Sequence, residues 1–250
     1  MISYKFLQYN TDNLRLGWSI LEKLAGSSDF LLLQRFPKDK QKELCNITGK
    51  AFLTESVMHK NMSLAIGRAE GLSSVGGVET INLPSSQLVQ AVGNEWQGCT
   101  ALRGMYNNIR LVSVLPCFPE PMGEFPITKE DNEKDIQFLL EKFKDEPTII
   151  VGDFHFSPED NAINELIESN GFKSYLDGHK TFKTSTGHFI NLDKLLCNFS
   201  IDISDIIVHN VDTDMQQGHF PITYTLSWEP NKKDESNEDI NEFKNLTLTG

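Results

Sequence analysis

Cysteine, long apolar runs and basic segments are all scarce in this chain of 250 residues. The cysteines at positions 45, 99, 117 and 197 form no Cys-x-x-Cys pair and lie near no His at zinc-site spacing, which argues against a zinc site. No apolar stretch approaches the roughly 20 residues of a membrane-spanning helix, and the first residues lack the basic and apolar regions of a secretory signal. We therefore expect reduced thiols, no membrane span and a cytoplasmic location, although an even number of cysteines leaves disulfides open.

Positive charge is also scarce. Lys and Arg together number 23 against 35 Asp and Glu, which gives a formal net charge of −12. An acidic surface repels phosphate backbones, and no run of Lys and Arg offsets this repulsion, so we expect no avid nonspecific nucleic-acid binding. The 39% of hydrophobic residues is enough for a folded core of considerable size.

Strand and helix patterns alternate along the chain. Continuous or alternating apolar residues predict strands, and apolar residues at helical spacing predict helices. The predicted strands lie at 4–10, 29–37, within a hairpin at 99–116 and at 148–153, with four short strands between 179 and 228; the predicted helices lie at 14–25, 129–145 and 158–171. This order predicts an α/β domain over residues 1–228, with two packed sheets and helices outside, followed by an acidic, disordered tail at 229–250.

One of these strands ends in a motif that suggests chemistry. The stretch "TIIVGDFHFSPED", residues 148–160, is an apolar strand that carries Asp153 to its tip and then opens into a polar loop with His155. A carboxylate at a strand end is a common component of phosphoryl-transfer sites, where it binds a metal or positions a nucleophile.

Four segments in this order resemble the endonuclease/exonuclease/phosphatase superfamily. They are "LQYNTDNLR", "DFLLLQRF", "IIVGDFHFSPED", and "INLDKLLCN" followed by "QGHFPITYTL". Their counterparts in the family are an opening strand with an N-x-D/N turn, a strand ending in Gln-Glu, the G-D-[FL]-N motif, and an I-D strand with a terminal S-D-H. The resemblance spans residues 3–228 and implies a DNase I-like, four-layer α/β sandwich of two mixed β-sheets flanked by helices.

The resemblance assigns site roles to five retained residues. Asn10 and Asp12 match the opening turn, where the Asn supports the site and the acidic residue faces the metal. Asp153 matches the Asp of G-D-[FL]-N, and Asp193 and His219 match the Asp–His pair that handles a proton or contacts the phosphate. Each has a plain structural alternative, such as a turn-forming Asn or a His at the start of a strand.

Four other family positions are replaced, one of which is a phosphate-facing polar or aromatic residue at a strand end, where this chain has Leu115, Pro116 and Cys117. Arg35 follows Gln34 where the family has its main metal-binding Glu, and a guanidinium cannot bind a cation. His155 takes the place of the Asn, and Gly218 takes the place of the Asp before His219. Only Asp12 and Asp153 remain as predicted metal ligands, so we expect either no cofactor or a weakly bound Mg²⁺ or Mn²⁺; His155 could also ligate a softer metal.

Arg35 suggests how the site is stabilised without a metal. Clustered carboxylates without a cation repel one another and raise their own pKa values. A guanidinium at the vacated position can pair with Asp153 or Asp12 and remove that repulsion. We therefore predict a closed cluster of charges around Asp153.

These features leave three functions open. The first is a domain of this fold with a degraded metal site, weak or inactive as an enzyme, that acts as a binding module for a phosphoester or protein partner. The second is an active metal-dependent phosphodiesterase or phosphatase with a rearranged site, using Asp153, His155 and His219. The third is an interaction protein that contacts its partner through the acidic tail from Glu229 onward.

Overall fold

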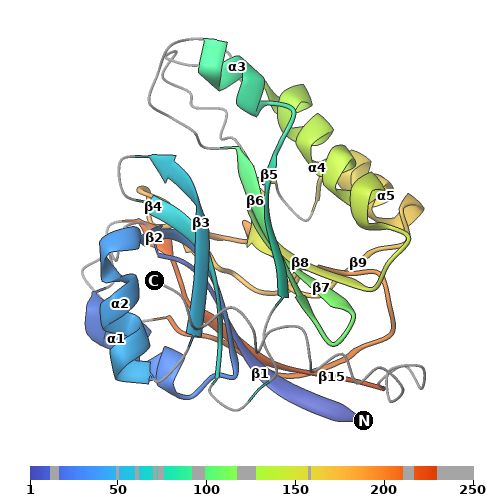
Figure 1. Cartoon of the computed structure of the whole chain (residues 1–250). Coiled ribbons are helices and arrows are strands. Elements are labelled where there is room, and N and C mark those ends of the chain that lie inside the picture. The colour runs from blue at the N-terminus through green and yellow to red at the C-terminus, as the bar shows by residue number, and fades with distance from the viewer. Residues whose placement is uncertain are drawn as a thin grey trace, which may run out of the picture.

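The structure is a computed structural model, and it describes residues 1–11, 17–48, 51–59, 62–69, 72, 76–91, 99–116, 128–156, 159–210 and 217–229. Two sheets lie face to face, with helices on the outer side of each (Figure 1). The first sheet has the spatial order β13 (Asp202–Val208), β15 (Ile222–Trp228), β1 (Ile2–Asn10), β2 (Phe30–Pro37), β4 (Met62–Arg68) and β3 (Ala51–His59). The second has the order β5 (Gly76–Asn82), β6 (Thr100–Tyr106), β7 (Ile109–Leu115), β8 (Thr148–Asp153), β12 (Asp193–Cys197) and β9 (Lys173–Ser174).

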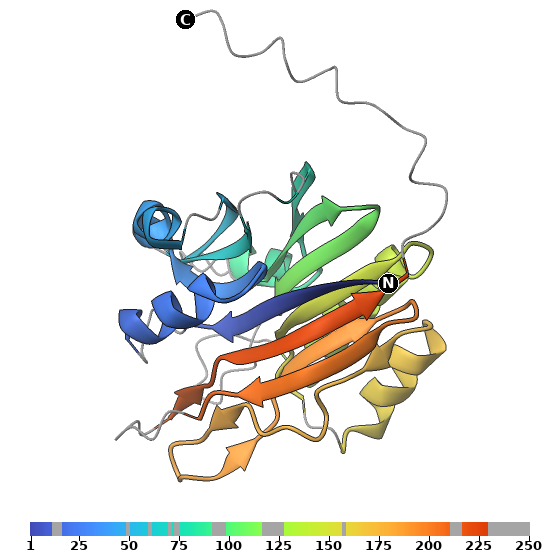
Figure 2. The same cartoon turned by 90° about the horizontal axis from the view of Figure 1, so that it is seen from below.

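The helices and a small third sheet complete the architecture. The helices are α1 (Trp18–Gly26), α2 (Gln41–Thr48), α3 (Ser86–Ala91), α4 (Lys129–Phe143) and α5 (Asn161–Ser169), with a short 3₁₀ turn, η1 (Lys38–Lys40). The small sheet has the order β11 (Phe189–Ile190), β10 (Phe182–Lys183) and β14 (Gly218–His219). It lies at the end of the sandwich where β1 ends (Figure 2).

Side-chain alternation along the strands builds a separate core between each pair of layers. On β1, Phe6 faces the second sheet, whereas its neighbour Leu7 packs with α1 and α2. On β2, Leu32 and Leu33 divide in the same way. The outer face of the second sheet packs against α4 and α5. The layers therefore run helices, sheet, sheet, helices, and the predicted four-layer α/β sandwich is confirmed.

Most predicted elements are present with shifted ends. The hairpin turns at Asn107 and Asn108, whose φ angles of 47° and 58° are those of a tight I′ turn. The helix predicted at 158–171 is α5, which begins after Asp160, where the Asp side chain accepts a hydrogen bond from the backbone N–H of Ile163. The prediction missed α2 and α3, which are short helices of eight and six residues.

The prediction of four reduced thiols is wrong for Cys99, which is disulfide-bonded, whereas Cys45 and Cys197 are free. In the part of the chain that the structure describes, no helix is long and apolar enough to cross a membrane. Three predictions fall outside the described residues, namely the role of Asp12, the state of Cys117 and the disorder of the tail beyond Glu229.

Candidate functional site

Four predicted site residues meet at one end of the sandwich because several strands begin or end there. Asn10 is the last residue of β1, and Asp153 is the last residue of β8. Asp193 is the first residue of β12 and pairs in register with Asp153. His219, on β14 of the small sheet, reaches both carboxylates. All four are buried.

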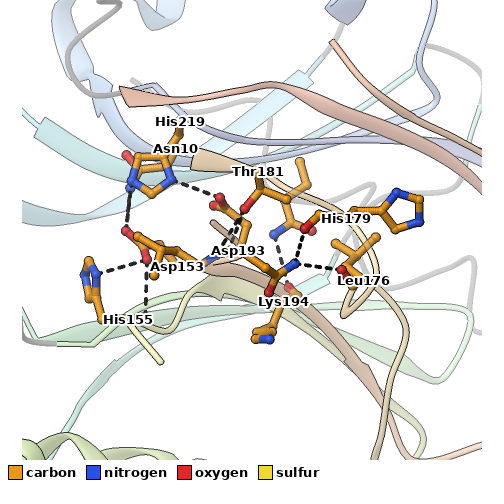
Figure 3. A network of polar contacts seen from close by, with 12 residues as sticks. Asn10, Asp153, His155, Leu176, His179, Thr181, Asp193, Lys194 and His219 are labelled. Atoms are coloured by element: carbon orange, nitrogen blue, oxygen red, sulfur yellow. Dashed lines mark hydrogen bonds and ion pairs between the residues drawn. The ribbon is translucent and has the colours of Figure 1, made fainter. Parts of the chain in front are cut away.

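The His219 ring lies between two carboxylates (Figure 3). Its Nδ1 is 2.9 Å from Asp193 Oδ2, and its Nε2 is 3.1 Å from Asp153 Oδ2. Burial by itself would lower the pKa of His219, but Asp193 and Asp153 together raise this pKa to about 10. At neutral pH the ring is therefore an imidazolium that donates a proton toward a carboxylate at each nitrogen.

Asp153 is the centre of the cluster. Besides His219, it accepts a hydrogen bond of 3.1 Å from Asn10 Nδ2 and one of 3.3 Å from the backbone N–H of His155. Burial would raise the pKa of Asp153, but its electrostatic interactions with His155, His219 and Arg35, together with the hydrogen bond from His219, outweigh burial and hold this pKa below its ordinary value. Asp153 is therefore ionised although it is fully buried.

Asp193 differs from Asp153 in its electrostatics. Burial raises the pKa of Asp193 above its ordinary value, even though His219 and a hydrogen bond from Thr181 act in the opposite direction. Thr181 Oγ1 also accepts hydrogen bonds from the backbone N–H groups of Leu192 and Asp193, at 3.2 and 3.1 Å. The hydroxyl of Thr181 thus fixes the start of β12, and the sequence alone did not single this residue out.

His155 packs on the other side of Asp153 (Figure 3). Its Nδ1 lies 3.1 Å from Asp153 Oδ1, and its backbone φ is 56°. Burial lowers the pKa of His155 to about 4, with Arg35 and His219 acting in the same direction against Asp153. His155 is therefore neutral at physiological pH. A left-handed φ is tolerated better by Asn, Asp and His than by most residues, which agrees with a His at this position.

Arg35 lies at an irregularity in β2. The pairing of β2 with β4 shifts register between Leu33 and Phe36, and Arg35 has a φ of 49°. Thr11 Oγ1 donates a 2.7 Å hydrogen bond to the Arg35 carbonyl. Arg35 is half-buried, and its charge is close enough to lower the pKa values of both Asp153 and His155. The expected influence of Arg35 on Asp153 is thus electrostatic.

The backbone conformation at position 218 explains why a glycine is found there. Its φ is 148°, a region that residues with a Cβ rarely adopt. An Asp before His219 would be strained in this backbone. A glycine at position 218 therefore agrees with the local path of the chain.

The described residues do not fit a divalent metal. Magnesium needs oxygen ligands that include one or two carboxylates, but Asp153 is surrounded by Asn10, His155 and the cationic His219, and it feels the charge of Arg35. Across the residues that the structure describes, no three His, Cys, Asp or Glu side chains are arranged to hold a metal ion.

Asn132 is a further residue that the sequence did not reveal. It lies in the first turns of α4, and its Nδ2 donates a 3.0 Å hydrogen bond to the carbonyl of Phe154, between Asp153 and His155. Helix α4 starts with a capping box made by Thr128 and Asp131, which fixes the turn from which Asn132 projects. Asn132 therefore holds the loop after β8 in place.

We expect Asn132→Ala to lower the free energy of unfolding by about 1–3 kcal/mol, because a buried carbonyl loses its partner. Hydrogen exchange should accelerate at residues 154–156. Gln137→Ala is the matched control, since Gln137 lies on the same helix and its exposed side chain donates a hydrogen bond to Glu141. Unchanged exchange at 154–156 in Asn132→Ala would show that the loop is held by other contacts.

Comparisons with known proteins place the fold. No protein-family model matches the chain, and no curated protein is similar to it in sequence. Among solved structures, an endonuclease/exonuclease/phosphatase from Beutenbergia cavernae has a TM-score of 0.67 at 12% identity over 90% of this chain and 72% of its own. One from Bacteroides vulgatus has 0.66 at 13%, over 92% and 100% of the two chains. ANGEL2, a 2′,3′-cyclic phosphatase, has 0.65 at 12%, over 90% and 95%.

The chain therefore has the endonuclease/exonuclease/phosphatase fold, and the predicted resemblance is confirmed for the fold. The low identities agree with the several replaced positions around Asp153.

Proposed function

We propose that this chain is a binding module built on a phosphoesterase fold, with weak or absent turnover, for a phosphoester or protein partner. The observation that carries the proposal is the environment of Asp153. Its carboxylate lies 3.1 Å from the imidazolium of His219 and feels the charge of Arg35. Cations that belong to the protein thus neutralise the carboxylate that would otherwise bind a metal.

The chemistry of these cations supports low turnover. Phosphoester hydrolysis in this fold needs a divalent ion to stabilise the developing negative charge. Losing one such electrostatic group typically costs on the order of 10²- to 10³-fold in rate. His219 is also engaged at both ring nitrogens, so a substrate must compete with Asp153 for Nε2.

A screen of phosphomonoesters and phosphodiesters with Mg²⁺, Mn²⁺ or Zn²⁺ tests this proposal. We expect no turnover above that of His219→Ala under any of these conditions. Metal-dependent turnover that disappears in His219→Ala would overturn the proposal.

The same observations leave one rival function, an active hydrolase with a rearranged site. The connected set Asn10–Asp153–His219–Asp193 favours it, because these are the family's groups for positioning a nucleophile and transferring a proton. In that case the imidazolium of His219 would protonate the leaving group. The screen above separates the two functions.

Three sequence predictions remain proposals. The domain boundary at 228 and partner contact through the tail from Glu229 can be tested by tail deletion: retained binding would exclude the tail as the contact. A cytoplasmic location is the third, and the disulfide at Cys99 argues for an oxidising compartment instead.

A further inference from the structure

The outer strand of the small sheet has an open edge. Among the strands that the structure describes, β11 comes last in the order β14, β10, β11 and pairs only with β10. The backbone N–H of Thr184 donates a 2.8 Å hydrogen bond to the carbonyl of His188, so these two residues form a hydrogen-bonded pair of the antiparallel ladder. The two kinds of pair alternate along such a ladder, so the N–H and C=O of the next residue, Phe189, point away from β10. An extended chain can therefore pair with this edge.

Each face of this edge exposes one large apolar side chain. The strand register places Ile190 on the same face as Phe182 and His219. Phe189 lies on the opposite face, together with Lys183. Ile190 is 39% exposed and Phe189 is 37% exposed. Since neighbouring residues of a strand point to opposite faces, a strand that covers both side chains needs two apolar residues an odd number of positions apart.

The hairpin around this edge is basic, although the protein is acidic. Residues 178–192 contain no Asp or Glu in a chain of net charge −12. Lys180 is exposed and precedes β10, so it lies beside the end of β11 that Ile190 forms. His188, at the other end of β11, is exposed as well. The edge therefore fits an acidic strand with apolar side chains on both faces.

The chain itself carries such a segment. Residues 234–243, with the sequence DESNEDINEF, lie outside the described residues, and every charged side chain among them is an Asp or a Glu. Ile240 and Phe243 are three positions apart, so in an extended chain their side chains point to opposite faces. The segment thus matches the edge both in charge and in the placement of its apolar side chains.

We propose that residues 238–243 add to β11 as a further strand of the small sheet, with Phe243 beside Phe189 and Ile240 on the face of Ile190. The added strand runs antiparallel to β11, which brings Glu238 to the end of the edge where Lys180 lies. This contact goes beyond the proposed function, because it covers the open edge of the sheet that carries His219.

The length of chain after β15 permits this contact. Phe189 is level with Gly218, and the path from Gly218 along β15 to Glu229 covers at most about 37 Å. An added strand lies three strand spacings from β14, about 14 Å, so Phe189 is at most about 40 Å from Glu229. The chain from Glu229 to Phe243 extends up to about 46 Å. The segment therefore reaches its own hairpin, and it arrives from the side that antiparallel pairing requires.

The same segment from a second copy fits the edge less well. Two chains of net charge −12 repel each other. A segment of the same chain is instead held near the edge at an effective concentration on the order of millimolar. We therefore assign the contact to one chain, and an acidic partner protein would have to displace it.

Hydrogen exchange of the full chain tests the proposal. We expect exchange at residues 187–190 to be about tenfold faster in the double variant Ile240→Ser/Phe243→Ser than in the wild type, because an added strand protects the amide groups of this edge. Leu246→Ser is the matched control, since Leu246 is an apolar residue beyond the segment, and it should leave this exchange unchanged. Equal exchange in β8 across the three proteins verifies that the domain remains folded.

Charge reversal tests the direction of the added strand. Lys180→Glu and Glu238→Lys should each accelerate exchange at residues 187–190, because each places two like charges at one end of the edge. The two changes combined should restore much of the wild-type protection. Additive acceleration in the combined variant would contradict the antiparallel arrangement.

Three results would overturn the proposal. They are exchange at 187–190 that Ile240→Ser/Phe243→Ser leaves unchanged, an equal effect of Leu246→Ser, and protection that rises with the concentration of the chain. The last result would assign the contact to a second copy. The screen for phosphoester turnover depends on none of these results, so the proposed function and this contact can fail separately.

Discussion

Arg35→Glu is expected to lower the melting temperature in EDTA by roughly 4–8 °C, which corresponds to about 2 kcal/mol for a chain of this length. The guanidinium lowers the pKa of the buried Asp153 carboxylate, whereas a Glu would repel that carboxylate. A φ of 49° disfavours Arg and Glu alike, so the Arg-to-Glu change leaves the backbone cost nearly unchanged. The expected shift therefore contains almost no backbone contribution and is dominated by the reversal of charge beside Asp153.

Magnesium should then recover part of this loss in the variant. A ligand that binds only the folded state at a hundredfold excess over its Kd stabilises it by about 2.7 kcal/mol. Thermal melts with and without 10 mM Mg²⁺, which is a concentration on the order of 100 times a sub-millimolar Kd, measure the effect. Arg35→Gln is the control, since it removes the positive charge without adding a ligand. If Arg35→Glu has the same melting temperature as the wild type in both buffers, the guanidinium of Arg35 does not stabilise the Asp153 carboxylate in place of a metal ion.

The second large effect is expected at His219. His219→Gln at neutral pH leaves Asp153 and Asp193 buried without their shared cation, and breaking a buried pair in this way costs about 3–5 kcal/mol. Combining it with Asp193→Asn should recover part of the loss, because one of the two facing charges is then removed. Urea unfolding of the single and double variants measures both values.

The pH dependence follows from the same residue. The pKa of His219 in the folded state, about 10, lies above its ordinary value of 6.5. The folded state therefore binds more protons between these values, so this stabilisation is complete below pH 6.5 and is lost as the pH rises toward 10. His155 acts at the acidic end: its pKa is lowered from 6.5 to about 4, so acidification through that range favours unfolding.

Urea unfolding of the wild type and His219→Gln at pH 7 and 9.5 tests the alkaline effect. The wild type should lose stability between the two conditions, and His219→Gln should lose much less. Equal losses in the two proteins would mean that the imidazolium of His219 does not stabilise the fold.

The sequence predicted the parts of the fold that depend on strand patterns. The apolar runs that became β1, β2 and β8 placed Asn10 and Asp153 at strand ends, and the ordered motifs related them to Asp193 and His219. The strands β7 and β8 are parallel, so their carboxyl ends lie at one edge of the second sheet. Strand β1 of the first sheet ends close to this edge, which brings Asn10 within hydrogen-bond distance of Asp153.

The remaining features depend on contacts that a pattern does not encode. Asn132 donates a hydrogen bond to the Phe154 carbonyl, 22 positions away in the sequence. Thr181 Oγ1 accepts a hydrogen bond from the backbone N–H of Asp193, 12 positions away. The left-handed conformations of Arg35, His155 and Gly218 arise from the local path of the chain, although each lies at a replaced position. The sequence identified the replacements but not the backbone geometry that accompanies them.

Isothermal titration of Mg²⁺ and Mn²⁺ into the wild type and Arg35→Glu tests the central claim, which is that protein cations replace the metal at Asp153. We expect no binding heat in the wild type and measurable binding in Arg35→Glu, because only the variant adds a carboxylate where the guanidinium lies. Stoichiometric Mg²⁺ binding to the wild type that Asp153→Asn abolishes would contradict the account.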